Sequence, residues 1–576
     1  MAIFFGAHSP SNPSGTINFK AYFSSIATSL KSENVFFNNN ICIGYLDLQI
    51  WEDESTRLNE HGLIAIAGQP VPNATSDFSI KRIDLLDKEF TVANTLFRDF
   101  SGSFASMFYN IVSDKLILVT DKLGVRPVYY AYIDNIFFFS NALWVLSGIE
   151  LLTKELNPLG LAETLAIGHP LSDRTIFRDI QVLSPGSLLE SSSAGLTKKF
   201  YWNWVSEIGE KTSTLSVDEL QDLFRTSVVS RLGKRDRATA FLSGGMDSRW
   251  IVEILSKFPI SIDTINFAPF GTKDQVFGKL ASIALSTSHM EYPGENLSFA
   301  DRLVDSINLF ELSKVHHNGI SRLRTIWSGD GGSVGVGHVY LTKEILDEAR
   351  QSGLDCAAKK IVVSQKYHVP MKLVREKYRH IFSAIYKSIH EELNLYASLE
   401  PGRACHLFFM MNDQRRHLFS HYENIHKSRI DFFLPFFDSR MVLNILKSPV
   451  DGFLYHRFYN EVFNRFAEPI RSVPWQSYPG HIKCPFSYSE NLRDQWADGW
   501  MDNNARKKEK ILLCRQGFVA LKKILFRKTI IHKPYLMASL LLSSTNLRSY
   551  DYFIETAIKL INIETSDIFF DGSPLT

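Results

Sequence analysis

A run of small and polar residues, Ser243–Ser248 (SGGMDS), follows the apolar stretch Ala238–Leu242 and precedes a helix-like pattern. At such a junction the N–H groups of the loop and of the helix N-terminus point towards an anion, and glycines let phosphate oxygens approach closely. The hydroxyls of Ser243 and Ser248 are further donors, and Asp247 can hold the Mg²⁺ that neutralises phosphates. A plain strand-to-helix turn also contains Gly and Ser, but six suitable residues in this context favour a phosphate site.

The segments around this loop alternate between strand and helix patterns. Strands are expected at Ala238–Leu242, Ser261–Phe267 and His289–Tyr292, and helices at Ser248–Lys257 and Gln275–Leu285. Alternation of this kind is typical of a parallel sheet in an α/β domain. The loop is therefore expected between a strand and a helix of such a domain.

The remainder of the chain divides into a strand-rich beginning and a helical end. Strands separated by Gly, Pro, Asn and Asp are predicted at Asn40–Leu46, Leu63–Ala67, Ser103–Ile111 and Lys115–Thr120, with a hairpin formed by Pro127–Tyr132 and Ile136–Ser140. A boundary is expected near residue 205, because Ser216 begins an amphipathic helix that runs to about Leu232. Beyond about Tyr340 the pattern is mostly helical.

Composition excludes several classes of protein. The 576 residues carry 63 Lys+Arg against 61 Asp+Glu, a formal charge of +2, and 45% are hydrophobic, which is typical of a globular chain of two or three domains. A net charge this close to zero gives no overall attraction to nucleic acid. The five Cys are scattered without a CxxC pair, which argues against a disulfide framework or a structural zinc. With no secretory signal or clean membrane span in the pattern, a cytoplasmic location is expected.

Several motifs together resemble the asparagine synthetase family. SGGMDS resembles the pyrophosphate-binding loop of ATP pyrophosphatases, which cleave ATP between its α and β phosphates, and no Walker sequence GxxxxGK[ST] occurs. The motifs that precede it in the family's order are Gly102–Ala105 (GSFA), Asp121–Tyr130 (DKLGVRPVYY), Pro185–Gly186 and Tyr201–Trp202. The resemblance extends over roughly residues 1 to 490.

This resemblance implies a mixed α/β fold in three parts. Residues 1–204 would form a glutaminase-like αββα sandwich of the Ntn class. Residues 205–495 would form the synthetase domain, an α/β domain with a parallel sheet of the PP-loop ATPase type. Residues 496–576 would form a helical, basic C-terminal extension.

The N-terminal part departs from the family pattern. Glutamine-using members have a Cys after the initiating Met, whose thiolate attacks the glutamine amide, whereas this chain has Ala2. The family's Asn-Gly-Glu segment is represented only by Ala67–Gln69. We therefore predict a glutaminase fold without glutaminase activity, as in the relatives that form β-lactams and lasso-peptide macrolactams.

The resemblance also implies a nucleotide site. Trp327–His338 resembles the family's SGEGADELFGG stretch and lies about 80 residues after SGGMDS. Ser333 stands where the family has an Asp that helps to bind Mg²⁺. The residues implied to bind ATP are Leu242, Ser243, Gly244, Gly245, Asp247, Ser248, Phe267, Ser328 and Gly329, with Asp247 as the Mg²⁺ ligand.

Three residues are candidates for catalysis. Asp330 falls on the first acid of the Gly-rich stretch, and Asp431 replaces the Glu of the family's EARVPFLD motif. The two could form a general-base pair, because paired carboxylates raise one another's pKa; alternatively, Asp431 is an ordinary surface acid. Lys483 resembles a family Lys that stabilises the acyl-adenylate, although an exposed Lys would look the same.

Three histidines have weaker signals. His289 matches a family His-x-Glu sequence but is more often structural. His417 and His421, four residues apart, could bind a metal or could form a polar helix face.

The expected function is an ATP- and Mg²⁺-dependent ligase that adenylates a carboxylate and transfers the acyl group to an amine or ammonia. The altered motifs favour a specialised small-molecule or peptide carboxylate. Alternatives are asparagine synthesis from aspartate and ammonia, and a non-catalytic ATP-binding protein. The nitrogen would come from free ammonia, from an amine on the substrate, or from an ammonia-supplying partner.

The end of the chain carries a basic segment. Between Arg506 and Lys533 there are ten Lys or Arg and a single acid, Glu509, interleaved with apolar residues. Such a segment could contact an anionic membrane or an acidic partner, or could be the solvated face of a terminal helix pair.

Overall fold

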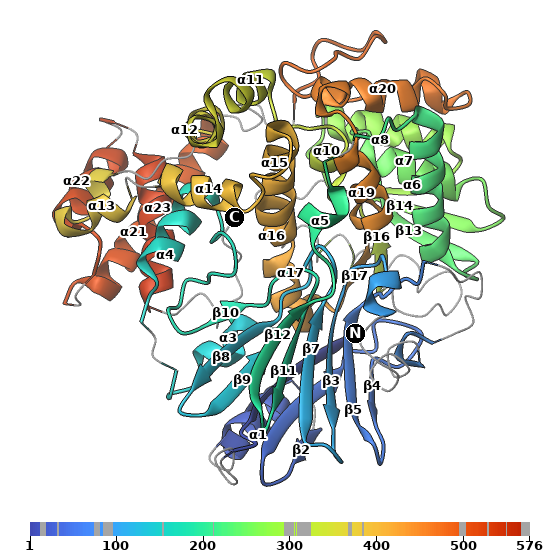
Figure 1. Cartoon of the computed structure of the whole chain (residues 1–576). Helices are drawn as coiled ribbons and strands as arrows, with labels where there is room; N and C mark the ends of the chain where they lie inside the picture. Colours follow the sequence, from blue (N-terminus) through green and yellow to red (C-terminus); the bar gives the residue numbers. More distant parts are fainter. Residues whose placement is uncertain are drawn as a thin grey trace.

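The fold is described from a computed structural model (Figure 1). It describes residues 1–11, 19–30, 34–73, 81–84, 96–152, 155–210, 212–292, 305, 307, 324–366, 371–382, 385–494, 503–526, 529–545, 547–548 and 550–565. The expected boundary between residues 495 and 496 lies outside these ranges.

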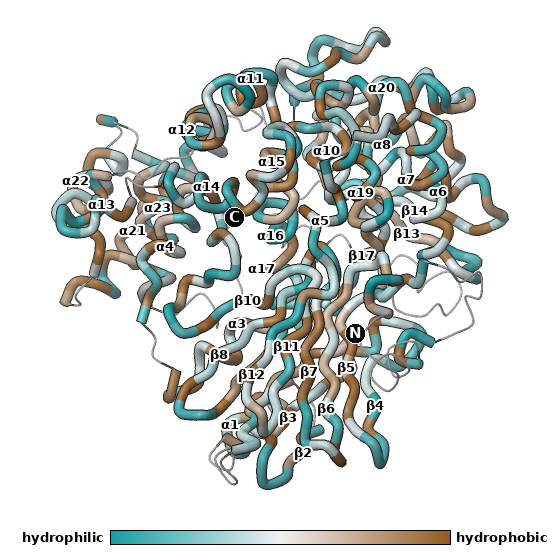
Figure 2. Tube along the Cα trace, in the orientation of Figure 1, coloured by the Kyte–Doolittle hydropathy of each residue, from teal (hydrophilic) through white to brown (hydrophobic). Residues whose placement is uncertain are grey.

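Two antiparallel sheets form the N-terminal part. The first has the order β10 (Gln181–Val182), β8 (Tyr129–Ile133), β9 (Ile136–Ser140), β1 (Ala2–His8), β3 (Ile41–Asp47), β2 (Val35–Phe37). The second has the order β12 (Gly195–Phe200), β11 (Ser187–Ser192), β7 (Lys115–Thr120), β6 (Phe104–Asn110), β5 (Gly62–Gly68), β4 (Thr56–Leu58). The sheets meet through β1 and β5, both buried along their whole lengths, and β5 and β7 are visibly hydrophobic in Figure 2.

Short helices cover and extend this sandwich. Helices α1 (Lys20–Ser29) and α3 (Leu143–Ser147) lie against the first sheet, and the Tyr22 hydroxyl of α1 donates to the Val145 carbonyl at 2.6 Å. Helix α4 (Pro158–Ile167) leaves the sandwich and contacts α13 (Arg379–Phe382) and α14 (Ile385–Asn394).

A parallel sheet of five strands forms the centre of the second part. Its order is β15 (Ser288–Glu291), β14 (Ser261–Asn266), β13 (Arg237–Phe241), β16 (Thr325–Trp327), β17 (Asp431–Phe433). Around it lie α6 (Val217–Leu232), α7 (Asp247–Leu255) and α8 (Lys273–Ala284) (Figure 1). The Ser216 hydroxyl accepts from the Glu219 N–H and the Glu219 carboxylate accepts from the Ser216 N–H, so the predicted start of α6 is confirmed.

The rest of the second part is mostly helical. Besides α13 and α14, its described residues before 464 include α10 (Gly332–Gly335), α11 (Lys343–Ser352), α12 (Leu354–Ser364), α15 (Pro401–Phe408), a π-helical turn (Phe409–Gln414), α16 (Arg415–His417), α17 (Phe419–Glu423), α18 (Ile425–Ser428), α19 (Ser439–Lys447) and α20 (Arg457–Phe463). The short helix α5 (Trp204–Ile208) lies between the sandwich and α6. Sandwich, parallel sheet and helical end occur in the order that the sequence predicts, so the fold class is confirmed.

The basic segment forms part of a bundle of three helices. Helix α21 (Asn503–Ile524) packs against α22 (Lys533–Ser544) and α23 (Asp551–Thr565). Cys514, Leu521 and Ile524 are buried in the bundle, whereas Phe526 at its end is 97% exposed. No helix among the described residues is long and apolar enough to cross a membrane.

Candidate functional site

The SGGMDS loop joins β13 to α7, as the sequence predicts. The Ser243 N–H donates to the Ser248 hydroxyl at 2.9 Å, and the Gly245 N–H donates to the Ser243 hydroxyl at 3.1 Å. The loop is thus folded back on itself by its two serines. The first N–H groups of α7 have no acceptor within the helix, as at every helix N-terminus.

Two buried contacts fix the loop from behind. The Gly244 N–H donates to the Asp274 carboxylate at 2.7 Å, at the start of α8. The guanidinium of Arg249, fully buried, donates to the Val473 and Pro474 carbonyls at 2.9 and 2.8 Å and to the Gly244 carbonyl at 3.3 Å. Burial raises the pKa of Asp274 to about 6 and lowers that of Arg249 to about 10. The loop is therefore held between α8 and the segment after α20.

Asp247, the first residue of α7, is surrounded by hydroxyl groups. Its two oxygens accept from the Tyr459 hydroxyl at 2.5 Å and from the Ser333 hydroxyl at 2.6 Å, and the Tyr478 hydroxyl donates to Ser333 at 3.4 Å. Burial raises the pKa of Asp247 to about 6, and the neighbouring charge of Asp330 acts in the same direction. Ser333, which differs from the family's Asp, is thus a hydrogen-bond donor to the very acid expected to bind Mg²⁺.

The loop after β16 lies directly against the start of α7. A Cβ on Gly329 would be 2.9 Å from both the Asp247 Cβ and the Ser248 backbone nitrogen, so only glycine allows this approach. Ser328, also in this loop, is buried. The second predicted segment therefore lies beside the first, with Ser328, Gly329 and Asp330 next to Asp247.

Asp330 is paired with a histidine whose role the sequence leaves open. Its Oδ1 is 3.2 Å from His417 Nε2, and its Oδ2 accepts from the Ser328 hydroxyl. The hydrogen bond to Asp330 raises the pKa of His417 to about 8, and the pKa of Asp330 lies below its ordinary value even though burial opposes the shift.

His421 has a different role from His417. Its ring stacks on Phe432 at 4.5 Å, and its Nε2 is 2.9 Å from the Ile430 carbonyl. The two histidines therefore contact different partners, and no cluster of three metal-binding side chains occurs in the part of the chain that the structure describes.

Asp431 differs from both expectations drawn from the sequence. It is completely buried at the start of β17, so it is not a surface acid. Arg126 of the N-terminal sandwich forms an ion pair with Oδ1 at 2.6 Å, and the Trp51 indole N–H donates to Oδ2 at 2.8 Å. This guanidinium holds the pKa of Asp431 below its ordinary value against the effect of burial.

The pairing of Asp330 with Asp431 is therefore corrected. Each carboxylate has its own cationic or protonatable partner, and both pKa values are lowered, whereas a carboxylate pair would raise one of them. Asp431 joins the two parts of the chain, and Asp330 lies on the loop that packs against the start of α7.

The remaining predicted residues have diverse surroundings. Leu242 is buried, and its carbonyl accepts from the Asn266 amide at 2.9 Å. Phe267 packs edge-on against Phe241 at 5.3 Å. Lys483 is exposed, and His289 is 2.8 Å from the Thr264 hydroxyl through Nδ1. None of these contacts tests a role in binding or catalysis.

The N-terminal site region is filled by the chain itself. The Met1 amine donates to the Ser55 hydroxyl at 2.5 Å, and burial lowers the pKa of this amine to about 5. The backbone of Gly68, in the Ala67–Gln69 segment, is covered by Arg126, because an added Cβ would be 2.0 Å from Arg126 Nε. Cys42 is buried with its thiol pKa raised to about 12, so it is a poor nucleophile.

Several residues of this site are not predicted by the sequence. Tyr459 and Tyr478, which surround Asp247, come from a segment without a recognisable motif, and Trp51 and Arg126 come from the other part of the chain. Arg126 lies within the motif DKLGVRPVYY, but nothing in its spacing indicates Asp431 as its partner.

Family models match two stretches of the chain. Residues 86–202 match the glutamine amidotransferase domain, and residues 219–321 match asparagine synthase. The two matches lie on either side of the boundary expected near residue 205.

Two curated relatives are similar over part of their lengths. "Asparagine synthetase [glutamine-hydrolyzing] 3" of Bacillus subtilis is 28% identical over 155 residues, 27% of this chain and 25% of the relative. "Putative asparagine synthetase [glutamine-hydrolyzing] 2" of Methanocaldococcus jannaschii is 22% identical over 253 residues, 41% of this chain and 49% of the relative. The matched regions thus span about a quarter and about half of these relatives.

Solved structures give weaker similarities. An allosteric regulatory enzyme of purine biosynthesis matches with a TM-score of 0.22 and 8% identity, over 51% of this chain and 80% of that chain. Glutamine phosphoribosylpyrophosphate amidotransferase from B. subtilis matches with a TM-score of 0.19 and 11% identity, over 41% and 54%. The fold assignment depends on the strand orders of the three sheets and not on these two structures.

Proposed function

Because the chain belongs to the asparagine synthetase family, we propose that it is an ATP-dependent ligase that forms an amide bond. In the first step a carboxylate oxygen attacks the α-phosphorus of ATP and pyrophosphate leaves. In the second step an amine or ammonia attacks the acyl carbon of the adenylate, a C–N bond forms, and AMP leaves with the electron pair of the broken C–O bond.

The observation that carries this proposal is the junction of β13 and α7. The SGGMDS loop leads into the N-terminus of α7 and contains two serine hydroxyls, and Arg249 and Asp274 hold it through hydrogen bonds to the Gly244 backbone. A helix N-terminus of this kind suits the charge of a pyrophosphate group. Leu242, Phe267, Ser328 and Gly329 would complete the nucleotide site.

The donor set at Asp247 suits a magnesium ion. Mg²⁺ is usually bound through one or two carboxylates together with phosphate oxygens, and the side chains that donate to Asp247 are the neutral hydroxyls of Tyr459 and Ser333. Burial raises the pKa of this carboxyl, and no cationic side chain among the described residues counteracts the shift. When bound, Mg²⁺ would neutralise the phosphates, while Tyr459 and Ser333 keep the carboxylate in place.

Two further residues belong to the proposed site. Asp330 follows Gly329, whose Cβ position is 2.9 Å from the Asp247 Cβ, so Asp330 lies beside the proposed nucleotide site. Lys483 is exposed on a segment next to the Gly244-binding residue Gln476, whose N–H donates to the Gly244 carbonyl at 2.9 Å. We assign to Lys483 the stabilisation of the adenylate's negative charge.

The nitrogen source and the substrate are inferred from the residues that depart from the family pattern. Since Ala67–Gln69 does not match the family's Asn-Gly-Glu segment and position 2 is Ala, we propose that ammonia, a substrate amine or an ammonia-supplying partner provides the nitrogen. Asp431 is occupied by Arg126 and Trp51 and is not available to a substrate. This favours a specialised carboxylate over aspartate, although the names of both relatives support asparagine synthesis.

A cytoplasmic location suits the five unpaired cysteines.

The test is ATP–pyrophosphate exchange by the purified full chain with Mg²⁺. Aspartate is compared with peptides, β-amino acids and uronic acids as carboxylate substrates. Exchange that depends on one carboxylate supports the ligase and identifies its substrate class. Asp247→Ala should abolish exchange, whereas Asp222→Ala, on an exposed position of α6, should not. ATP binding without exchange for any carboxylate, or no ATP binding at all, would favour a non-catalytic protein.

A further inference from the structure

His417 contacts the loop after β16 through Asp330, with Nε2 3.2 Å from Asp330 Oδ1. Its side chain is 54% exposed, whereas its partner Asp330 is 25% exposed. Asp330 in turn follows Gly329, which lies in contact distance of Asp247 and Ser248. Gly329 and Asp330 thus link the His417 imidazole to the SGGMDS loop. The imidazole itself is exposed and accessible to a substrate.

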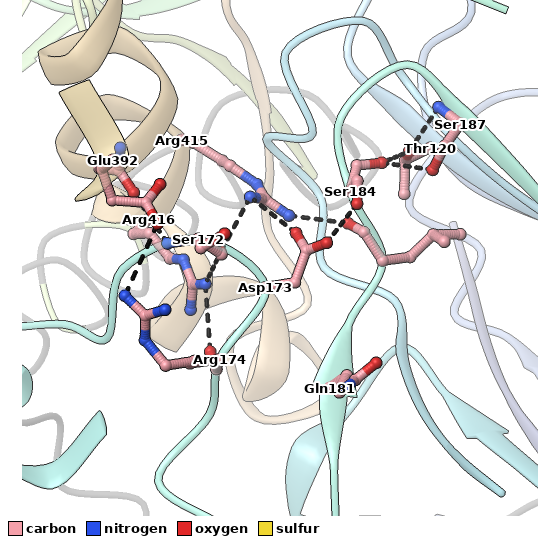
Figure 3. Close-up of polar contacts among 12 residues, drawn as sticks. Thr120, Ser172, Asp173, Arg174, Gln181, Ser184, Ser187, Glu392, Arg415 and Arg416 are labelled. Carbon is pink, nitrogen blue, oxygen red and sulfur yellow. Dashed lines mark hydrogen bonds and ion pairs between the residues drawn. The ribbon is translucent and has the colours of Figure 1, made fainter. Parts of the chain in front are cut away.

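The two residues before His417 are buried arginines that anchor its helix (Figure 3). Arg415 donates to the Leu183 carbonyl at 2.7 Å and pairs with Asp173, and Arg416 donates to the Ser172 and Arg174 carbonyls at 2.5 and 3.2 Å. Both guanidinium groups are almost completely buried. Anchors on loops of the N-terminal sandwich thus set the direction in which α16 presents His417.

The hydrogen bonds of the pair determine which ring nitrogen is available. Because His417 Nε2 faces Asp330 Oδ1, this nitrogen carries the proton, and Nδ1 can accept one. The second oxygen of Asp330 accepts from Ser328, which fixes the carboxylate plane. A carboxylate that orients an imidazole in this way is a common design for a general base.

We propose that His417, oriented by Asp330, is the general base that deprotonates the attacking amine. This inference rests on the proposed ligase function and names the class of nucleophile: an amine that is protonated at neutral pH. His417 Nδ1 first takes one proton from the ammonium group and so frees the electron pair of the nitrogen. The nitrogen then bonds to the acyl carbon, the C–O bond to AMP breaks with its electron pair going to the phosphate oxygen, and the second proton leaves the nitrogen to water. His417 would be a catalytic residue, and Asp330 would be a positioning residue for it.

The charged surroundings of His417 agree with this role. Asp330 and Asp413, which precedes α16 in the π-helical turn, both raise its pKa, to about 8. His169, after α4, is close enough for His417 to lower its pKa. Arg416 and His421 are the other titratable groups nearby on its own segment. A base must be neutral, so the transfer rate should rise with pH through about 8.

The experiment separates the two half-reactions. The full chain and His417→Gln are assayed for ATP–pyrophosphate exchange with the carboxylate that supports exchange, and for amide formation with ammonium. Exchange should be unchanged, while amide formation should fall by roughly 100-fold or more, the usual contribution of a general base. In the variant the rate should follow the fraction of unprotonated ammonia and keep rising with pH, without the levelling-off above about pH 8 that the wild-type chain should show. Hydroxylamine, which is unprotonated at neutral pH, should still form hydroxamate at the wild-type rate.

Each result has one meaning. Equal losses of exchange, amide and hydroxamate would show a structural role and overturn the inference, as would unchanged amide formation. A wild-type chain that exchanges with no carboxylate would instead overturn the proposed function. His61→Gln, on the exposed surface of the sandwich, is the matched control and should change nothing.

A second measurement requires no substrate. An NMR titration of the histidine ring signals should give His417 a pKa of about 8, and Asp330→Asn should lower it. An ordinary pKa for His417 in the wild-type chain, or no change on Asp330→Asn, would overturn the pairing itself.

Discussion

The buried carboxylate of Asp247 lowers the stability of the folded chain while providing a site suited to a cation. Its oxygens accept from the Tyr459 and Ser333 hydroxyls, which are neutral and leave the charge of the carboxylate uncompensated. The pKa of Asp247 is raised from an ordinary value of 3.8 to about 6, chiefly by burial. The folded chain therefore holds a proton on this carboxyl more tightly than the unfolded chain does.

The sign of this shift gives a prediction for Asp247→Asn in buffer without Mg²⁺. Because the folded state binds more protons between pH 3.8 and 6, the wild-type chain loses stability in this range as the pH rises. The Asn side chain cannot ionise. The difference between the thermal midpoints, variant minus wild type, should therefore increase from pH 4 to pH 7. Differential scanning fluorimetry across this range measures the difference. A midpoint difference that stays constant or decreases over this range would contradict a raised pKa of Asp247 in the folded chain.

At the scale of elements, the junction between β13 and α7 depends on two glycines with different neighbours. A Cβ on Gly244 would be 2.7 Å from the Lys273 carbonyl oxygen and 2.8 Å from the Asp274 Cα, both backbone atoms of α8. A Cβ on Gly245 would meet only the Ser243 hydroxyl, at 3.3 Å. One glycine therefore allows two elements to pack, and the other leaves the front of the loop open.

Alanine at these two positions should separate folding from binding. Gly244→Ala should lower the thermal midpoint by several degrees, because α8 must move away from the loop. Gly245→Ala should leave the midpoint almost unchanged but weaken ATP binding, because its Cβ faces the expected phosphates. Thermal unfolding and calorimetric ATP titration of both variants provide the comparison. Similar midpoints for the two variants would contradict the assigned packing.

Elements of this kind were largely predictable from the sequence. The start of α6 at Ser216, the loop before α7 and the strands of both parts can be inferred from caps, periodicity and glycines, which are local signals. The pairings of Asp330 with His417 and of Asp431 with Arg126 were not predictable, since 87 and 305 residues separate the partners. A spacing along the chain carries no information about contacts that only the packed fold creates.

At the scale of the whole molecule, the two parts of the chain share a buried ion pair. Arg126 comes from the segment after β7, and Asp431 begins β17 of the parallel sheet. Their side chains are 1% and 0% exposed, so water cannot replace either partner. Trp51 adds its indole N–H to Asp431 and packs edge-on against Phe433 at 5.2 Å.

Removal of one partner should therefore be costly. Arg126→Met should destabilise the chain by about 3–5 kcal/mol, the usual cost of an unpaired buried charge. The double variant Arg126→Met, Asp431→Leu should recover part of this loss, although the Trp51 N–H then lacks its acceptor. Urea unfolding followed by tryptophan fluorescence measures all three proteins. Equal stabilities of the wild type and Arg126→Met would show that the pair does not hold the two parts together.

The shared ion pair also decides where this chain can be divided. The linker near residue 205 is an obvious position at which to truncate the chain or to exchange one part with that of a relative. A cut there would leave Asp431 without Arg126 and Trp51, and it would deprive Arg415 and Arg416 of the carbonyls that they bind. A chimaera must therefore take both sides of this interface from one parent protein, because side chains and carbonyl groups of the sandwich are needed to fold the second part of the chain correctly.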